Sequence, residues 1–199
     1  GVCAPKGFVA NGMRVGIKES RKINDTALVF SEVPCNAAGV FTQNRVQSES
    51  VKIAKKYLAD GKAQAAIEIS GNANTCTGAQ GAENAFRMAK WAAEALGIKT
   101  EDVIVYSTDV IGAQFDVTKV ENNIQTLKNG LSKEGHKEAR VAIMTTDTQY
   151  KECAVEFQID GKTCRMGSMC KGSGMIHINM GTMLSFVTTD CAISSKMLD

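Results

Sequence analysis

Hydrophobic and polar residues follow two different periods along the chain, and each change of period marks a new element. Apolar runs punctuated by Asn, Pro, Gly and Asp predict strands at 27–33, 38–42 and 65–70. Later runs predict further strands at 103–107 and 140–147. The chain is therefore expected to be rich in β structure.

A period of three and four residues predicts a helix over 81–97. Its apolar face is formed by Phe86, Ala89, Ala93 and Leu96. Glu83 and Arg87 are one turn apart on the opposite side, where they can form an ion pair. Gly97 is a suitable C-terminal stop.

A second helix is expected to begin at Thr118. The Thr118 hydroxyl and the Glu121 carboxylate have the spacing of a reciprocal N-terminal cap. Its apolar stripe consists of Val120, Ile124, Leu127 and Leu131. These residues are expected to be core positions.

The clearest turn signal is Asp160-Gly161, which suits a type I′ hairpin. Val155, Phe157 and Ile159 alternate with polar neighbours before it. Sheets covered by helices are the natural way to bury these elements, so the expected fold class is α/β (α+β). No linker or internal repeat interrupts residues 1–199, which predicts a single domain.

Composition excludes several classes of function. The 199 residues carry a net charge of +2 without a dense Lys/Arg cluster, which argues against nucleic acid as a partner. No apolar run approaches the length of a membrane span. The N-terminal GVCAPKGF lacks the apolar core of a secretory signal, so a cytoplasmic location is expected.

The seven cysteines are odd in number and contain no CxxC pair, which predicts neither a disulfide framework nor a metal site. Most are expected to be reduced, buried thiols. Cys164, Cys170 and His177 lie close in sequence, but core packing is the preferred interpretation over zinc binding. His136 lies in a polar stretch and is expected in a solvated loop.

Four stretches differ from ordinary elements in being rich in small and polar residues: SGNANTCTG (70–78), STDVIG (107–112), MTTDT (144–148) and KGSGM (171–175). Taken singly, each is typical of a turn or strand end. Thr182, which follows Gly181, has two interpretations. It is either a β-branched strand residue or a nucleophile that attacks the Gly181 carbonyl, after which its freed α-amine serves as the base.

The ordered combination of motifs is more specific. APKGF, AGVFTQNRV, SGNANTCTG, STDVIG, AIMTTDT, KGSGMI and NMGTML occur in this order over essentially the whole chain. The series closely resembles the N-terminal half of the ornithine acetyltransferase family, also called glutamate N-acetyltransferases, of arginine biosynthesis.

The resemblance implies an α-β-β-α sandwich and transfer of an acetyl group from N-acetylornithine to glutamate through an acetyl-threonine intermediate. It implies no cofactor, although some members accept acetyl-CoA as donor. Members cleave themselves before the motif threonine, giving α and β chains that stay together. The expected partner is therefore the protein's own C-terminal β-chain half, in a hetero-oligomer of α and β chains.

Matched motif by motif, the resemblance makes Thr182 the nucleophile and Gly181–Thr182 the scissile bond. Thr108 and the residue after it, Asp109, match the oxyanion-hole pair. Thr145 and Lys171 match substrate-binding positions.

Two departures leave alternatives open. The family has glycine where this chain has Asp109, and a carboxylate pointing into the hole would oppose the charge to be stabilised. A chain cut before Thr182 would end at Gly181, whereas this sequence continues to Asp199, as expected of an uncut chain, a fragment or a divergent member. The alternatives are a self-processing aminopeptidase or amidase of the same fold, and an unprocessed, non-catalytic paralogue.

Overall fold

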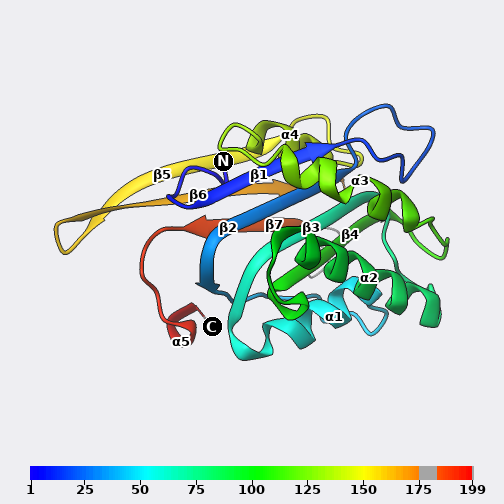
Figure 1. Ribbon diagram of the computed structural model, residues 1–199, viewed down its shortest axis with the longest axis horizontal. Coiled ribbons are helices and arrows are strands. Elements are labelled where there is room, and N and C mark those ends of the chain that lie inside the picture. The colour runs from blue at the N-terminus through cyan, green and yellow to red at the C-terminus, as the bar shows by residue number, and fades with distance from the viewer. Residues whose placement is uncertain (175–182, 199) are drawn as a thin grey trace.

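The computed structural model of the protein describes residues 1–174 and 183–198. The described strands form two sheets (Figure 1), with strand orders β1-β2-β3-β4 (sheet A) and β5-β6-β7 (sheet B). Sheet A contains β1 (Phe8–Met13), β2 (Thr26–Asn36), β3 (Lys62–Asn72) and β4 (Val103–Val110). Sheet B contains β5 (Lys151–Ile159), β6 (Lys162–Lys171) and β7 (Leu184–Thr189).

Sheet A is antiparallel except for its last pair, β3 and β4, which run parallel. The connection between these two strands contains α2 (Gly78–Leu96), since parallel neighbours need a long crossover. Their register places Glu68 beside Tyr106 and Ser70 beside Thr108. Side chains alternate along a strand, so these residues share one face of the sheet.

Helices cover the opposite face of sheet A. They are α1 (Glu49–Tyr57), α2 and α3 (Thr118–Asn129), and a core containing Ile67, Ile69 and Met88 fills the space beneath them. The short helices are α4 (His136–Ala142), α5 (Ser195–Leu198) and the 3₁₀ turns Leu58–Asp60 and Thr100–Asp102. No helix in the described ranges is long and apolar enough to cross a bilayer.

A second core lies between the two sheets. Met169 of β6 and Phe186 of β7 pack there against sheet A, and the Phe186 ring meets Tyr106 edge-on with centroids 4.6 Å apart. Helix α4 closes the same core through Ala139 and Ala142. The expected α+β class with packed sheets is confirmed.

Two predicted strands are wrong. Residues 38–42 form no strand, because Val40 is exposed and the chain leaves sheet A after Asn36. Residues 140–147 contain the end of α4 and an irregular segment. The buried residues Ala139, Ala142 and Ile143 have the spacing of one helix face. The strand was predicted because an apolar run of this length is also typical of a strand.

The predicted helix at 81–97 is confirmed, although it begins at Gly78, and Ala89 and Ala93 of its predicted apolar face are buried. Phe86 is exposed, while smaller side chains such as Ala85 and Ala92 are buried against the sheet. Arg87 pairs with Glu121 of α3 at 3.6 Å, not with Glu83 as expected. Gly97 does end the helix, with a left-handed φ of 71°.

The second predicted helix is confirmed, with Val120, Ile124 and Leu127 buried and Leu131 partly buried. Its predicted cap is wrong. The Thr118 hydroxyl donates to the Asp116 carboxylate (2.6 Å), which also accepts the Thr118 N–H (3.0 Å). Asp116 therefore accepts the N–H that the predicted cap assigned to Glu121.

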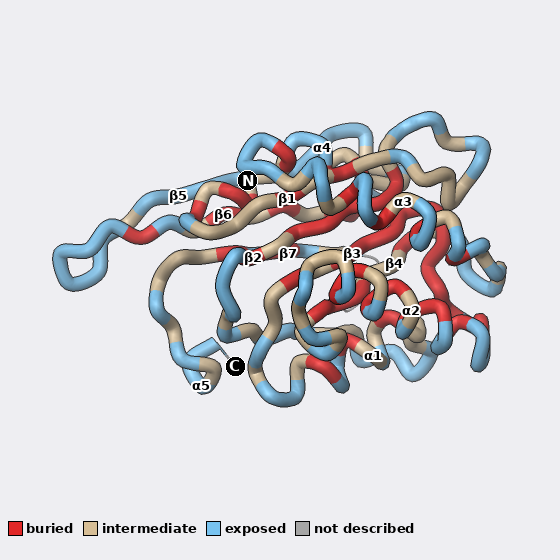
Figure 2. Tube along the Cα trace, in the orientation of Figure 1, coloured by how far each residue is buried: buried red, intermediate tan, exposed pale blue. Residues whose placement is uncertain are grey.

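The predicted hairpin is confirmed, with positive φ at both Asp160 and Gly161 (50° and 72°). Figure 2 shows that the far end of β5 and β6 is largely exposed. The register puts Val155, Ile159 and Val187 on the face of sheet B that points away from sheet A, and all three are exposed. This outer apolar face therefore differs from the covered outer face of sheet A.

Candidate active site

Lys171, the last residue of β6, lies at the centre of a buried polar cluster. The residue is only 2% exposed, and its Nζ donates to the hydroxyls of Thr108 (3.2 Å) and Thr145 (2.6 Å). Thr108 comes from β4, whereas Thr145 comes from the segment after α4. Residues from three separate sequence motifs therefore meet at one ammonium group.

Asp147 supports this cluster from the same segment as Thr145. Its carboxylate accepts from Lys151 Nζ (2.7 Å), the Gly172 N–H (2.8 Å) and the Thr145 N–H (3.3 Å). Burial raises the pKa of Asp147, but these hydrogen bonds outweigh it and the net pKa is lowered. Asp147 thereby fixes the backbone directly after Lys171 and the backbone at Thr145.

Asp109 has an ion-pair partner of its own. Its Oδ2 accepts from Lys18 Nζ at 3.2 Å, and its φ of 112° lies in the region that favours glycine. The neighbouring Gly71 also has positive φ, and a Cβ there would lie 3.0 Å from the Cβ of Lys18. The glycine therefore leaves room for Lys18 to reach the aspartate.

Glu68 was missed by the sequence analysis, which assigned its strand but no role for its side chain. The residue is 1% exposed, and neither carboxyl oxygen has a hydrogen-bond partner in the described chain. Burial raises its pKa well above the usual value, while the nearby charge of Lys171 acts in the opposite direction. A polar residue between two isoleucines was the available signal.

The amide-rich stretch 70–78 forms a turn that is held by hydrogen bonds from its own side chains. Asn72 accepts the Asn74 N–H (2.8 Å), and the Asn74 side chain in turn donates to the Gly81 carbonyl and accepts from the Thr77 hydroxyl. The backbone also joins the 107–112 turn, through a bond from the Ala73 N–H to the Val110 carbonyl (2.8 Å). Its polar groups therefore hold the ends of β3 and β4 together.

Gly181, Thr182 and His177 lie outside the described residues. The described residues on either side are informative, because Lys171 pairs with Leu184 in the register of sheet B. The residues that flank this part of the sequence are thus direct neighbours in sheet B.

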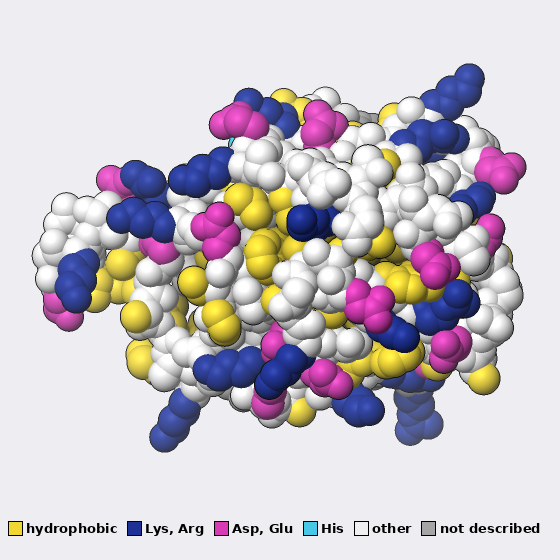
Figure 3. All heavy atoms as spheres, in the orientation of Figure 1, with side chains coloured by type: hydrophobic (Ala, Val, Ile, Leu, Met, Phe, Trp, Pro, Cys, Tyr) yellow, Lys and Arg dark blue, Asp and Glu magenta, His cyan; other side chains and the backbone are white. Residues whose placement is uncertain are grey.

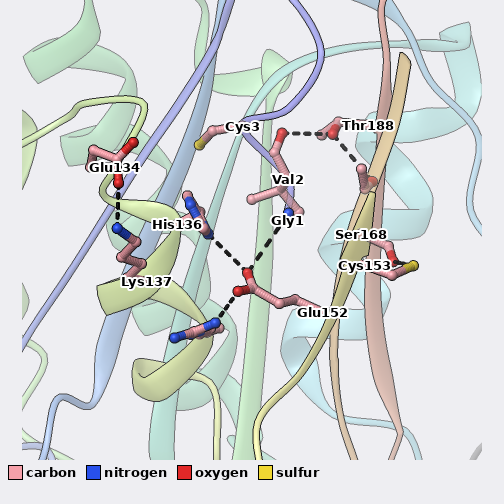
Figure 4. A network of polar contacts seen from close by, with 12 residues as sticks. Gly1, Val2, Cys3, Glu134, His136, Lys137, Glu152, Cys153, Ser168 and Thr188 are labelled. Carbon is pink, nitrogen blue, oxygen red and sulfur yellow. Dashed lines mark hydrogen bonds and ion pairs between the residues drawn. The ribbon is translucent and has the colours of Figure 1, made fainter. Parts of the chain in front are cut away.

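A second polar network, shown in Figure 4, surrounds Glu152 of β5. Its carboxylate accepts from His136 Nδ1 (2.9 Å) and is paired with Arg140, and the Gly1 nitrogen lies 3.8 Å away. The expectation that His136 is a solvated loop residue is wrong, because it starts α4 and bonds to sheet B. This network ties a helix to a strand.

The cysteines are all free thiols, but only Cys3 and Cys164 are buried, so the expectation of mostly buried cysteines is wrong. Within the described ranges no three His, Cys, Asp or Glu residues are grouped as a metal site would require. On the face seen in Figure 3, Lys and Arg are interspersed with Asp and Glu.

Comparison with known proteins matches residues 9–199 to the model of the ArgJ family. The chain is 50% identical over 195 residues to the arginine biosynthesis bifunctional protein ArgJ of Caldanaerobacter subterraneus, covering 98% of this chain and 48% of that protein. The chain thus spans about half the length of the curated relatives it matches.

Two solved structures are similar throughout. ArgJ of Bacillus halodurans superposes with a TM-score of 0.83 at 37% identity, covering 92% of this chain and 94% of that one. Ornithine acetyltransferase of Mycobacterium tuberculosis, complexed with ornithine, gives 0.81 at 34% identity, with 92% and 96% covered. The family match and these identities together establish that the chain belongs to the ArgJ family.

Proposed function

We propose that the chain is the N-terminal half of an acetyltransferase that moves an acetyl group from N-acetylornithine to glutamate, with Thr182 as nucleophile. The observation that carries this proposal is the meeting of Thr108 and Thr145 at Lys171, beside the ends of the segment that contains Thr182. Family membership and the names of its relatives point to the same activity.

The donor arrangement around Thr108 suits an oxyanion hole. An ammonium group has three donors and no acceptor, so the Thr108 oxygen accepts from Lys171 and its own hydrogen is free to donate. An acyl carbon under attack develops negative charge on oxygen, and one preorganised donor there is worth about 3 to 4 kcal/mol. The Asp109 N–H is the second donor in this assignment.

The Lys18–Asp109 ion pair removes an objection to that assignment. A free carboxylate beside the hole would oppose the developing charge, but a partner at 3.2 Å compensates it. This contact also weakens the case for a silent paralogue, since the departure from glycine comes with its own cation.

Substrate binding is assigned to Lys171 and Thr145. Lys171 has one N–H left after its two threonine bonds, and its positive charge suits the carboxylate of an amino-acid substrate. Thr145 is only partly buried, and its hydroxyl oxygen accepts from Lys171, so its hydrogen is free to donate to a substrate.

The reaction needs no cofactor. The Thr182 hydroxyl attacks the Gly181 carbonyl and the Gly181–Thr182 C–N bond breaks, which frees the Thr182 α-amine and leaves an ester. Water then hydrolyses the ester, which releases the Gly181 carboxylate and the Thr182 hydroxyl. That amine, with an ordinary pKa of about 7.7 to 8.0, then takes the hydroxyl proton as the oxygen attacks the acetyl carbonyl. Ornithine leaves and the glutamate amine accepts the acetyl group. Acetyl-CoA is a possible second donor, and the assigned compartment is the cytoplasm.

The C-terminal half is the proposed partner. The chain spans about half of its relatives, and the outer face of sheet B is apolar and exposed, as at Val187. Helices of the second half placed there would complete an α-β-β-α sandwich.

Mass spectrometry of the full-length gene product tests the proposal. We expect a chain beginning at Thr182, gaining one acetyl group on incubation with N-acetylornithine and losing it to added glutamate. Thr182→Ala should abolish both events, whereas Thr163→Ala, an exposed threonine on β6, should not. Full activity in Thr182→Ala contradicts the proposal, and hydrolysis indifferent to glutamate would favour an amidase.

A further inference from the structure

Glu68 is a buried carboxyl group, unpaired within the described chain, to which the proposed function assigns no role. A carboxyl group at 1% exposure without a hydrogen bond costs several kcal/mol unless it holds a proton or faces a cation. Its place on β3 puts it beside Tyr106 and two residues before Ser70, which pairs with Thr108. Thr108 in turn binds Lys171, so Glu68 lies one row below the cluster and faces sheet B.

The charged groups that act on Lys171 come from several elements. The acidic ones are Asp147 after α4, Asp109 of β4 and Glu68 of β3, and the basic one is Arg21 between β1 and β2. Tyr106 stays neutral, because burial, with a further contribution from Glu68, raises its pKa to about 12.

Most of these charges have partners of their own. Asp147 is paired with Lys151, and Asp109 with Lys18. Arg21 donates to the Ser70 hydroxyl at 3.2 Å. Among the described residues that face Lys171, Glu68 is the carboxyl left without a hydrogen bond or a cation of its own. Burial favours the protonated form of Glu68 and the charge of Lys171 favours its carboxylate, so Glu68 and Lys171 are charged together or neutral together.

We propose that Glu68 is a positioning residue that acts through Lys171: it is the buried counter-ion that keeps the lysine protonated and so keeps Thr108 as a donor. This inference rests on the proposed function. A neutral amine has a lone pair and accepts the Thr108 hydrogen, which removes that hydrogen from the oxyanion hole. An ammonium group accepts nothing, so the hydrogen stays available.

Burial lowers the pKa of Lys171, while the carboxylates of Asp147, Glu68 and Asp109 raise it. Removing the Glu68 charge therefore shifts the lysine toward the neutral form. We expect Glu68→Gln in the full-length enzyme to move the alkaline limb of the kcat profile down by about 1 to 3 pH units. At the plateau below that limb its kcat should approach that of the parent.

Glu156→Gln is the matched control, because Glu156 is an exposed glutamate on β5 paired with Arg165. Its kcat profile should coincide with that of the parent. A pH-independent loss in Glu68→Gln would indicate packing alone, and an unchanged profile would show that Glu68 does not act on Lys171. Either result overturns the proposal.

A stability cycle tests the pair without reference to catalysis. Glu68→Gln and Lys171→Met should each lower the melting temperature at pH 7, because each leaves one buried charge uncompensated. The double variant should melt above either single variant. If Glu68→Gln does not fold, adding it to Lys171→Met should still raise the melting temperature. Additive losses overturn the proposed electrostatic coupling between Glu68 and Lys171. If the cycle shows coupling but the protein transfers no acetyl group, only the proposed function is refuted.

Discussion

Two polar networks of this molecule join carboxylates to cations, yet they differ in what they leave unpaired. In the Glu152 network, His136 and Arg140 engage both carboxylate oxygens, and Arg140 also lies over the Tyr150 ring at 3.6 Å. In the Lys171 network, two hydroxyls bind the cation and the facing Glu68 has no hydrogen bond. Among the described residues, the first network pairs its carboxylate fully and leaves only the buried Nε of Arg140 without a partner, whereas the second leaves a whole buried carboxyl group unpaired, which indicates a site for chemistry.

The largest expected contrast is between loss of activity and loss of stability. Lys171→Met should lower kcat/KM by about 10²- to 10³-fold, because Thr108 loses the donor that orients it. Arg140→Met should leave kcat/KM near the parent value and lower the free energy of unfolding by about 1 to 3 kcal/mol. Steady-state kinetics and urea unfolding of both variants measure the contrast. Because Lys171→Met is also expected to lower stability, the distinction rests on kcat/KM, and equal losses of kcat/KM in the two variants would erase it.

A smaller effect is expected at the Lys18–Asp109 pair. Lys18→Ala should reduce kcat by about tenfold, because the aspartate charge beside the proposed oxyanion hole is then uncompensated.

In an Asp109→Gly background the same Lys18→Ala change should have almost no effect on kcat. The four proteins form a double-mutant cycle, and acetyl transfer at a fixed pH is the measurement. A tenfold loss in both backgrounds would show that Lys18 acts independently of Asp109.

The Glu152 network should have a pH signature of its own. Burial raises the pKa of Glu152, but the hydrogen bond and charge of His136, with Arg140, outweigh this and lower it overall. A carboxyl whose pKa is lowered on folding stabilises the protein above its unfolded value of about 4.5, and that contribution is lost as the pH falls through the folded value.

Glu152→Gln should therefore lower the melting temperature at pH 7 and match the parent near pH 3. Thermal unfolding at both values checks this, and Glu156→Gln is again the exposed control. A constant difference across the range would contradict the assigned role of the charge.

The success of sequence reasoning varied with how local each signal is. Asp160-Gly161 specifies its own turn, so the hairpin was predictable. Residues 140–147 were not, because their apolar side chains are buried by sheet A, which a local window does not contain. The prediction that Phe86 is buried was wrong for a similar reason, since α2 packs closely on the sheet and only side chains as small as alanine fit between them.

Prediction of the site came from the resemblance, which named Thr108, Thr145 and Lys171 without stating that they touch. Glu68 was not predictable, because alternation in a strand normally turns a polar residue toward solvent. Here both faces of sheet A are covered, by helices on one side and by sheet B on the other. The proposed role of Glu68 thus depends on long-range packing.

The pairing of Lys171 with Leu184 determines what the proposed self-cleavage would do to sheet B. A break between Gly181 and Thr182 would assign β6 and β7 to different polypeptides, although six residue pairs still join them side by side. Asp190, just beyond β7, also accepts the backbone N–H groups of Arg165 and Lys6. The two products would share one hydrogen-bonded ladder, so cutting the covalent link need not separate them.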